Sequence, residues 1–469
     1  MPDPRDPVDA WLEAGVQPLA PLPGSYDRIR RQARRRKTGR ALIGAAGAAV
    51  VIAAAVAAPS VASGLHGNAV SRLRPTAQGT NASLPRHQGA GSPNSQSSAQ
   101  VPPLSSSLSA TGSGIAVPPN FQPTSVTFVG TSIGAVIGQA GSPGHCATRY
   151  CTSLAGTFNY GQSWYGVSAP VTGSPEGSFG VSQIRFLDVR NGWAFGPALW
   201  VTHDGGASWT QENTFGQRVV DLEASGDRAF ALLATCTGTG PAYAAGCTGF
   251  SLYSSPADSD QWTQVTGPTA SLPTPAGQAG SASLVLAAGR GYLLAPSGQL
   301  LSGLLTGAAW TVASPSVPCA PGPPGPGGQP TDALLGADPA GLVLVCSTSE
   351  ATGDSQQKTV EESADGGQQW SVAGYPPVTG IAESLAAEPG GQLVLATDAG
   401  IYCSGPGGST WQLAQASPAD SAAGEAGFSY VGMTSAQNGV ALPADSGLHE
   451  VFTTTDGGDT WQAHAVSGP

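Results

Sequence analysis

Residues 186–209 read FLDVRNGWAFGPALWVTHDGGASW and contain the pattern that decides the fold. Two apolar stretches and a GWAFG segment are separated by turn residues, and the stretch ends in THDGGASW. Short apolar segments bounded by Gly, Pro, Asn and Asp are typical of β-strands joined by tight turns. We therefore predict four consecutive antiparallel strands, at residues 181–189, 192–196, 199–204 and 208–213.

The end of this stretch recurs along the chain. THDGGASW at 202–209 is matched by SADGGQQW at 363–370 and TTDGGDTW at 454–461, and we call these three segments the DGG turns. Two partial copies have Asn159 and Pro406 in place of the Asp. The Trp residues that end the copies, 41 to 60 residues apart, are Trp164, Trp209, Trp262, Trp310, Trp370, Trp411 and Trp461. A period near 50 residues with several short strands per repeat predicts a β-propeller with one blade per repeat.

The DGG turns resemble Asp boxes, also called BNR repeats, of the sialidase-like propeller superfamily. Segment 186–209 is most similar to the repeats of photosystem II assembly factor propellers, and sortilin-type ectodomains share the box. The resemblance implies an all-β, seven-bladed β-propeller with four-stranded antiparallel blades over residues 116–469. It implies nothing about activity, because one fold hosts many functions.

Physical chemistry explains the DGG turns without catalysis. The Asp accepts N–H bonds within a tight turn, the Gly pair supplies positive φ, and the Trp covers the neighbouring blade. The residues to which we assign this structural role are Thr202, Asp204, Gly206, Trp209, Ser363, Asp365, Gly367, Trp370, Thr454, Asp456, Gly458 and Trp461.

Six of the seven cysteines map to one face of the expected ring. Strand direction alternates within a blade, so the connections between second and third strands, and those between blades, open onto the face opposite the DGG turns. We call this the stapled face. Fifteen pairings of six cysteines are possible, and nearness favours Cys146–Cys151, Cys236–Cys247 and Cys319–Cys346 in an exported protein. Cys403 is expected to be a buried thiol in the third strand of repeat six.

The first 115 residues differ in composition from the repeats. Eight basic residues between Arg28 and Arg40 precede the uncharged segment ALIGAAGAAVVIAAAVAA at 41–58. We predict a cytoplasmic polybasic segment at 1–40, a transmembrane helix at 41–63 and a disordered Ser/Pro/Gly-rich linker at 64–115. The protein would then be a single-pass cell-membrane protein with its propeller outside the cytoplasm. A cleaved signal peptide is the alternative, because Ser60-Val61-Ala62 resembles a cleavage site.

The charge of the repeats limits the classes of partner. Residues 116–469 contain 25 acidic and seven basic side chains, which disfavours nucleic acid. Loops fixed by disulfides reduce the entropic cost of recognition, so we expect a protein, peptide or glycan to bind the stapled face. Asp354, Asp420 and Glu425 lie in connections on that face, but scattered acids are usually solvated. We predict no metal site and no cofactor.

A carbohydrate-active hydrolase is the alternative function. Sialidases hold their substrate with three Arg from several blades, whereas this chain has only Lys358 after Arg290 and lacks the family's FRIP motif. Its earlier arginines crowd into the first three repeats, at Arg149, Arg185, Arg190, Arg218 and Arg228. No spacing nominates a pair of carboxylates, and His145 beside Cys146 has no clear zinc-binding companions. We therefore expect a non-catalytic protein.

Overall fold

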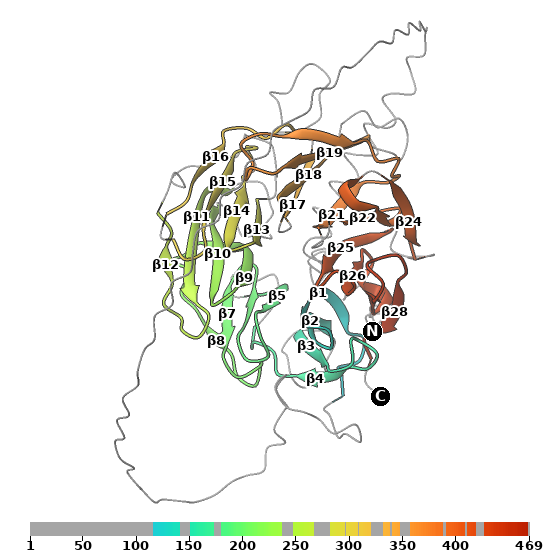
Figure 1. Cartoon of the computed structure of the whole chain (residues 1–469). Coiled ribbons are helices and arrows are strands. Elements are labelled where there is room, and N and C mark those ends of the chain that lie inside the picture. Colours follow the sequence, from blue (N-terminus) through green and yellow to red (C-terminus); the bar gives the residue numbers. More distant parts are fainter. Residues whose placement is uncertain are drawn as a thin grey trace, which may run out of the picture. The chain divides into compact units, whose positions relative to one another are not determined.

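The strands of each repeat pair in the order in which they occur in the sequence. A computed structural model shows seven four-stranded antiparallel sheets arranged as the blades of one ring (Figure 1). It describes residues 116–140, 151–172, 180–236, 247–266, 282–295, 297–307, 309–319, 332–337, 340–347, 357–387, 391–408, 410–418 and 426–467. The predicted all-β propeller with seven four-stranded blades is therefore confirmed.

The blades are continuous in sequence. Blades 1 and 2 contain β1 (Gln122–Val129), β2 (Ile133–Ala140), β3 (Cys151–Thr157), β4 (Tyr165–Val167), β5 (Gln183–Phe186), β6 (Gly192–Phe195), β7 (Leu199–Thr202) and β8 (Thr210–Gln211). Blades 3 and 4 contain β9 (Arg218–Ser225), β10 (Arg228–Cys236), β11 (Cys247–Pro256), β12 (Thr263–Gln264), β13 (Ser283–Ala287), β14 (Arg290–Leu294), β15 (Leu300–Leu304) and β16 (Thr311–Ser314). Blades 5 and 6 contain β17 (Asp332–Ala337), β18 (Leu342–Ser347), β19 (Lys358–Ser363), β20 (Ser371–Gly374), β21 (Ala382–Ala387), β22 (Leu393–Thr397), β23 (Gly400–Ser404) and β24 (Trp411–Ala416). Blade 7 contains β25 (Phe428–Met433), β26 (Gly439–Pro443), β27 (Glu450–Thr454) and β28 (Gln462–Ala465).

The predicted strands of blade 2 are longer than the observed ones. Residues 181–189 contain only the four-residue strand β5, and residues 208–213 contain only the two-residue strand β8. Ser208 and Trp209 belong to the DGG turn, where Ser208 donates its N–H to the Asp204 carboxylate instead of joining the sheet. Local side-chain hydrogen bonds of this kind compete with strand pairing.

The middle strands are buried on both sides, because each blade is packed between two others. All residues of β6, β22 and β26 are buried, which explains their continuous apolar sequences. The buried apolar side chains form seven clusters, and each cluster lies between two neighbouring blades. The core of the propeller is thus divided among seven junctions.

The repeated Trp residues pack into these junctions in one direction. Each lies in the cluster shared with the preceding blade: Trp310 of blade 4 contacts the cluster with blade 3, and Trp461 of blade 7 lies in the cluster with blade 6. For Trp164 of blade 1 the preceding blade is blade 7, and its cluster contains Val440 and Val451. The first and last repeats therefore close the ring by the same packing that joins every other pair.

Hydrogen bonds of two further side chains also join blade 1 to blade 7, at what we call the closing junction. The Tyr160 hydroxyl lies 2.7 Å from the carbonyl oxygen of Gly439 and 2.9 Å from that of Thr454, both in blade 7. Nδ1 of His449 lies 2.7 Å from the carbonyl oxygen of Phe121. Residues 116–121, which precede β1, form no strand.

The DGG turns share one hydrogen-bond pattern. In the first, the Thr202 hydroxyl donates to Asp204 Oδ1 at 2.8 Å and accepts the Gly206 N–H at 2.8 Å, while Asp204 also accepts the N–H of Ser208. The turn that contains Asn159 repeats these contacts with an amide oxygen in the carboxylate position. Both Gly residues of the second DGG turn have positive φ, and the second is also restricted by space, because a Cβ on Gly367 (φ +93°) would lie 2.2 Å from the Leu300 side chain of the preceding blade.

The N-terminal predictions lie outside the described residues. They concern the cytoplasmic segment 1–40, the transmembrane helix 41–63 and the linker 64–115. Within the part of the chain that is described, no helix is both long and apolar enough to cross a membrane.

Candidate functional site

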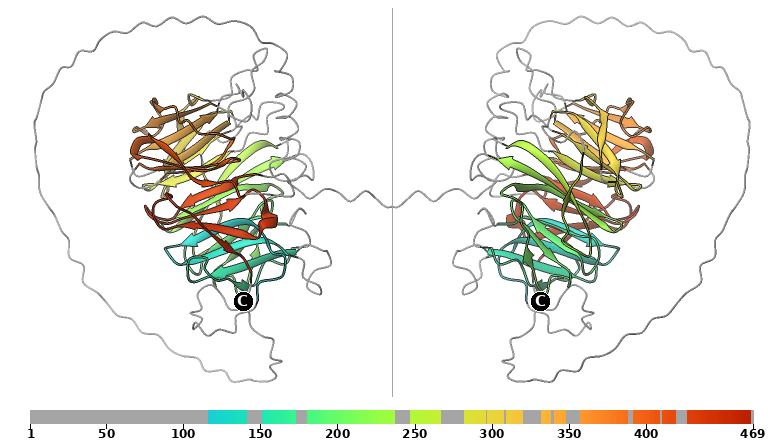
Figure 2. Two further views of the ribbon diagram at one scale, coloured as in Figure 1. Left: turned by 90° about the vertical axis from the view of Figure 1, so that its right-hand side faces the viewer. Right: turned by 90° about the vertical axis from the view of Figure 1, so that its left-hand side faces the viewer.

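The two faces of the ring carry different features. The first and third strands of every blade run in one direction and the second and fourth in the other, so the strands cross the ring from face to face (Figure 2). The DGG turns join third to fourth strands and lie on one face. The stapled face is the opposite one, where β3 begins, β18 ends and the chain passes from blade to blade.

Disulfide cysteines lie on the stapled face. Cys319, after β16 of blade 4, is bonded to Cys346 of blade 5 with a Cα–Cα distance of 5.4 Å, which is one of the three predicted pairings. Cys151 at the start of β3 is also a disulfide cysteine, and its predicted partner Cys146 lies outside the described residues.

The backbone of blade 3 brings the remaining predicted pair together. Cys236 and Cys247 lie directly opposite each other in the register of β10 and β11. All the cysteines that we assigned to the stapled face and that the structure describes are therefore found there. Cys403, by contrast, is a buried thiol in β23.

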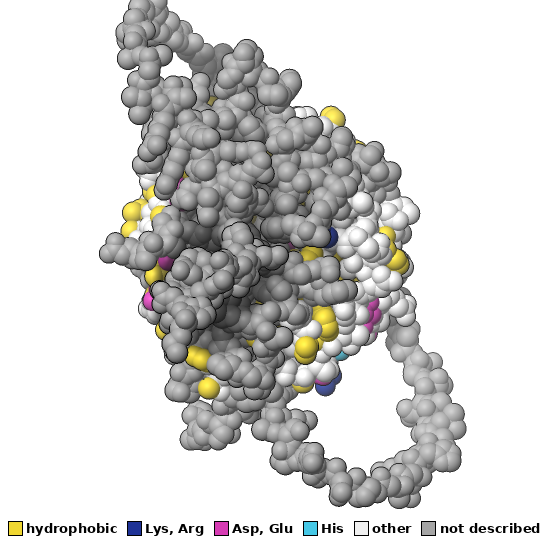
Figure 3. Space-filling view, turned by 180° about the vertical axis from the view of Figure 1, so that it is seen from behind, with side chains coloured by type: hydrophobic (Ala, Val, Ile, Leu, Met, Phe, Trp, Pro, Cys, Tyr) yellow, Lys and Arg dark blue, Asp and Glu magenta, His cyan; other side chains and the backbone are white. Residues whose placement is uncertain are grey.

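The stapled face also exposes large apolar side chains. Among the described residues the three most exposed ones are Val171, Tyr375 and Phe215, at 90%, 76% and 62% of their full accessibility. Each lies in a connection between consecutive blades, after β4, β20 and β8 respectively. Seen from behind the ring, described apolar side chains are exposed in several separate places, and Lys and Arg are scarce (Figure 3). Separate anchors of this kind suit a partner that spans several loops.

The Phe215 connection is held in an unusual conformation. Phe215 has φ +55° and is followed by Gly216 with φ +74°, while the N–H of Gln217 donates to the carbonyl of Thr214 at 2.9 Å, as in a type I′ turn. Positive φ is uncommon for a bulky residue. The Asn213 side chain accepts the Phe215 N–H at 2.8 Å, and the ring stacks on Tyr253 with a centroid separation of 5.8 Å. The turn thus fixes an exposed aromatic ring.

A buried lysine holds the connection between β20 and β21, which carries Tyr375. Lys358, which is 2% exposed, donates from Nζ to the carbonyl of Val378 at 3.2 Å and to that of Gly380 at 2.6 Å. Burial lowers the pKa of Lys358 to about 8, although the Asp398 carboxylate acts in the opposite direction. The Lys358 ammonium thus satisfies two carbonyl groups of this connection.

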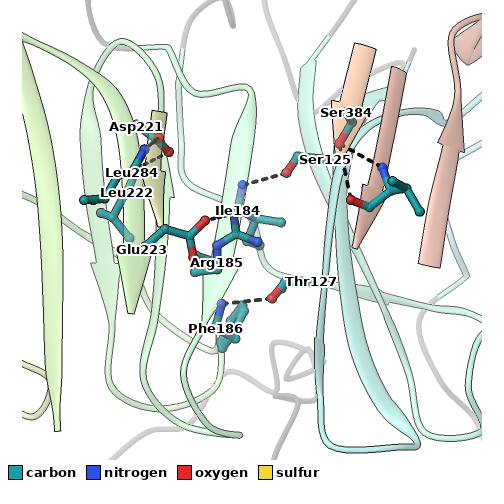
Figure 4. A network of polar contacts seen from close by, with 11 residues as sticks. Ser125, Thr127, Ile184, Arg185, Phe186, Asp221, Leu222, Glu223, Leu284 and Ser384 are labelled. Atoms are coloured by element: carbon teal, nitrogen blue, oxygen red, sulfur yellow. Dashed lines mark hydrogen bonds and ion pairs between the residues drawn. The ribbon is translucent and has the colours of Figure 1, made fainter. Parts of the chain in front are cut away.

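A second polar group lies where the innermost strands meet at the centre of the ring. Arg185 of β5 points toward Glu223 of β9, and Nη2 lies 2.6 Å from Oε1 (Figure 4). Their side chains are 20% and 27% exposed, and Tyr430 of β25 contributes to raising the pKa of Arg185. Burial raises the pKa of Glu223 to about 7; Arg185 lowers it in part, whereas the neighbouring Asp221 adds to the rise.

Most side chains in this central group bind the backbone of the next blade. Asp221 accepts the N–H of Leu222 at 2.8 Å and that of Leu284 in blade 4 at 2.9 Å (Figure 4). Ser125 and Ser384 accept the corresponding N–H groups of Ile184 and Val431, each at 3.2 Å. The open edge of an innermost strand needs such acceptors. One Asp221 oxygen thus joins blade 3 to blade 4, while the other binds the backbone of its own strand.

The other candidates from the sequence do not converge on a site. Arg228 and Arg290 bind Ser254 and Ser302 within their own blades, away from Arg185. His203 lies in a DGG turn, with Nε2 3.1 Å from Asp260. Asp354, Asp420, Glu425, His145 and Arg149 lie outside the described residues. Within those residues no group of three His, Cys, Asp or Glu side chains is arranged to hold a metal ion.

Sequence reasoning missed the Arg185–Glu223 pair and the role of Lys358. The two members of the pair are 38 residues apart and belong to different repeats, so no local motif joins them. Lys358 offered one signal: it is the only Lys or Arg after Arg290.

Comparison with known proteins gives similarity of structure alone. No protein-family model matches the chain, and no curated protein matches its sequence. Similar solved structures include YCF48 bound to a D1 peptide, at 17% identity over 73% of this chain and 96% of that one, with a TM-score of 0.46. They also include YCF48 from Cyanidioschyzon merolae (14% identity, 73% and 98%, TM-score 0.45) and the computationally designed protein Ika8 (9%, 76% and 92%, TM-score 0.43). Similarity this low carries no argument about partner or activity.

Proposed function

We propose that this chain is a membrane-anchored binding propeller that holds a protein or peptide partner on its stapled face. The anchor is the apolar segment 41–63, and the polybasic residues before it keep the N-terminus in the cytoplasm. The propeller then works outside the cytoplasm, as a scaffold without catalytic activity of its own. Glycans remain a second class of ligand for the same face.

One observation carries this proposal: the three most exposed large apolar side chains of the described residues, Val171, Phe215 and Tyr375, all lie on the stapled face. Exposed aromatic residues on fixed loops are typical binding anchors, because little conformational freedom is lost when the partner docks. The Cys319–Cys346 disulfide joins blade 4 to blade 5, and the Lys358 hydrogen bonds hold the connection that carries Tyr375.

Site-specific photocrosslinking on the full chain in its own membrane tests the proposal. The photoreactive residue benzoylphenylalanine replaces Val171, Phe215 or Tyr375 in separate variants. Matched controls carry it at Leu304, Val372 or Leu413, which are about half exposed but lie away from the connections between blades. We expect one adduct of the same mass from at least two stapled-face positions and none from the controls. Adducts only from the control positions would refute the proposal.

A carbohydrate-active hydrolase is the second candidate, and the Glu223 carboxyl favours it. Its pKa of about 7 suits general acid or base catalysis, and Arg185 lies beside it. The test is turnover of a panel of chromogenic glycosides, including sialosides, by the full chain at several pH values, with and without calcium. Turnover that disappears in Glu223→Gln would replace the scaffold proposal, whereas its absence from folded, oxidised protein would leave binding as the function.

A further inference from the structure

The connection from blade 5 to blade 6 is an extended platform on the stapled face. From Tyr375 to Gly380 its residues alternate between exposed and buried, so that Tyr375, Pro377 and Thr379 face outward while Pro376 and Val378 face the core. Alternation of this kind requires an extended backbone with one face against the protein. We call residues 375–380 the Tyr375 platform.

The Tyr375 platform is fixed before any partner arrives. Lys358 binds two of its carbonyl groups, those of Val378 and Gly380. The Thr379 hydroxyl hydrogen-bonds to that of Tyr402, and Val378 belongs to the core cluster between blades 5 and 6. The disulfide cysteine Cys346 lies on β18, which pairs with the strand that begins at Lys358. An exposed ring on such a support binds with little loss of conformational entropy.

The charge of this half of the ring indicates what the platform accepts. After Arg290 the sequence contains 16 Asp and Glu residues and one cation, Lys358, whose ammonium is buried beneath the platform. From 116 to 290, by contrast, six Arg offset most of the charge of nine acidic residues. Blades 5 to 7 thus carry a net negative charge, and their one Lys or Arg, Lys358, is buried instead of lying at the surface. A field of one sign steers partners of the opposite sign.

Described carboxylates lie on the same face as the platform. Asp398 is in the turn between β22 and β23, Asp445 lies between β26 and β27, and Glu450 begins β27. All three are half-buried and lie at strand ends on the stapled face. Asp398 accepts the Ile381 N–H and interacts with the Lys358 ammonium, and Asp445 accepts the Gly447 N–H. The net charge of blades 5 to 7 therefore supplies the negative potential on the face that exposes the Tyr375 ring. A guanidinium prefers an aromatic surface in such an environment.

We infer that the Tyr375 platform receives an arginine-bearing segment of a protein partner, with a guanidinium stacked on the Tyr375 ring. This inference rests on the proposed function and specifies the partner's chemistry. Arg is favoured over Lys because its planar guanidinium stacks on an aromatic face and is more weakly hydrated. The same surface repels acidic segments, so it selects by sign of charge.

Fluorescence anisotropy with designed peptides tests the inference on the full chain, oxidised and kept in mild detergent. The probe is a labelled twelve-residue peptide with four Arg in a Gly/Ser background. Two matched peptides carry citrulline, the neutral isostere of Arg, or Glu at the same positions. We expect binding of the Arg peptide alone, weakening as salt rises from about 0.05 to 0.5 M because exposed charges are screened.

Three variants of the protein separate a specific platform from general charge attraction. Tyr375→Ala is expected to weaken binding of the Arg peptide about two- to tenfold, the range for a cation–aromatic contact near the surface. Tyr375→Phe keeps the ring and is expected to bind within about twofold of wild type. Leu413→Ala, on the edge strand of blade 6, is the control and is expected to change nothing.

The outcomes distinguish this inference from the proposed function. Equal binding of the citrulline peptide, or an unchanged affinity in Tyr375→Ala, would overturn the arginine assignment. If crosslinks to a partner still formed at Phe215 and Val171, the proposed function would stand. If no stapled-face position crosslinked while the control positions did, the proposed function would fail as well.

Discussion

Replacing Lys358 by Met is expected to change how the stability of the propeller depends on pH. In the folded protein the pKa of Lys358 falls to about 8 from its ordinary 10.5, chiefly because the ammonium is buried. The unfolded chain therefore binds more protons than the folded one between these two values, and the free energy of unfolding rises with pH there. Each pKa unit corresponds to about 1.4 kcal/mol.

The magnitude follows from that difference. Between pH 7.5 and 10.5 this one side chain is expected to add about 3 kcal/mol to the free energy of unfolding of wild type. Lys358→Met has no titratable group at this position, so the difference between wild type and variant isolates the contribution. The variant also loses the donor to the carbonyls of Val378 and Gly380, which lowers its stability by a similar amount at both pH values.

Urea denaturation followed by Trp fluorescence measures the effect at both pH values for wild type and Lys358→Met. The only other lysine is Lys37, and Lys37→Met is the control, since it retains Lys358 and is expected to follow wild type. The stability of wild type relative to Lys358→Met is expected to increase by about 3 kcal/mol from pH 7.5 to 10.5. A difference that stays constant within about 1 kcal/mol, or that falls as pH rises, would show that the Lys358 ammonium is not destabilised by burial.

Three further predictions concern the ring and its staples. Tyr160→Phe is expected to lower the free energy of unfolding in urea by about 1–2 kcal/mol, because it removes the hydroxyl that contacts the carbonyls of Gly439 and Thr454 across the closing junction. The control is Tyr165→Phe, which should be neutral or stabilising because the buried Tyr165 hydroxyl has no hydrogen-bond partner. Equal losses of stability in the two variants would refute the reasoning. Removal of the Cys319–Cys346 disulfide by a double change to Ser is expected to lower the free energy of unfolding by about 3.5 kcal/mol, the entropy of closing a loop of 27 residues; identical denaturation curves for oxidised wild type and the double variant would contradict it. Asp204→Ala is expected to lower the free energy of unfolding by about 1–2 kcal/mol, since the carboxylate accepts hydrogen bonds from Thr202 and Ser208. Asp204→Asn should lose less, because the Asn159 side chain accepts the equivalent N–H bond in its own turn. Thermal unfolding that ranks the two variants in the opposite order would count against this account.

The repeat pattern predicted the ring because a blade is a local structure. Even the copies that keep little beyond Trp262 and Trp310 form complete blades, since the strands pair in sequence order and need only short turns between them. The Cys319–Cys346 bond could be predicted from the sequence because strand direction alternates within a blade, which assigns every connection, and each cysteine in it, to one face.

Contacts between blades were beyond the sequence. Arg185 meets Glu223 because two innermost strands approach at the centre of the ring, and that approach depends on the packing of the whole molecule. Likewise, Lys358 gave no local sign that it would bind the carbonyls of a connection about 20 residues later. Apolar composition alone would have assigned Phe215 and Tyr375 to the core, and their exposure depends on the backbone conformation of the connections that carry them.

Among the strands that the structure describes, none is shared between the two ends of the chain. Every sheet is built from one uninterrupted stretch of sequence, and Trp164 joins blade 1 to blade 7 as the other Trp residues join their neighbours. A propeller of this kind has no privileged starting blade. Circular permutation, with the ends of blades 1 and 7 linked and a new opening cut between two other blades, would leave all seven sheets intact. The order of the blades around the ring matters for this fold, whereas the point at which the chain begins does not.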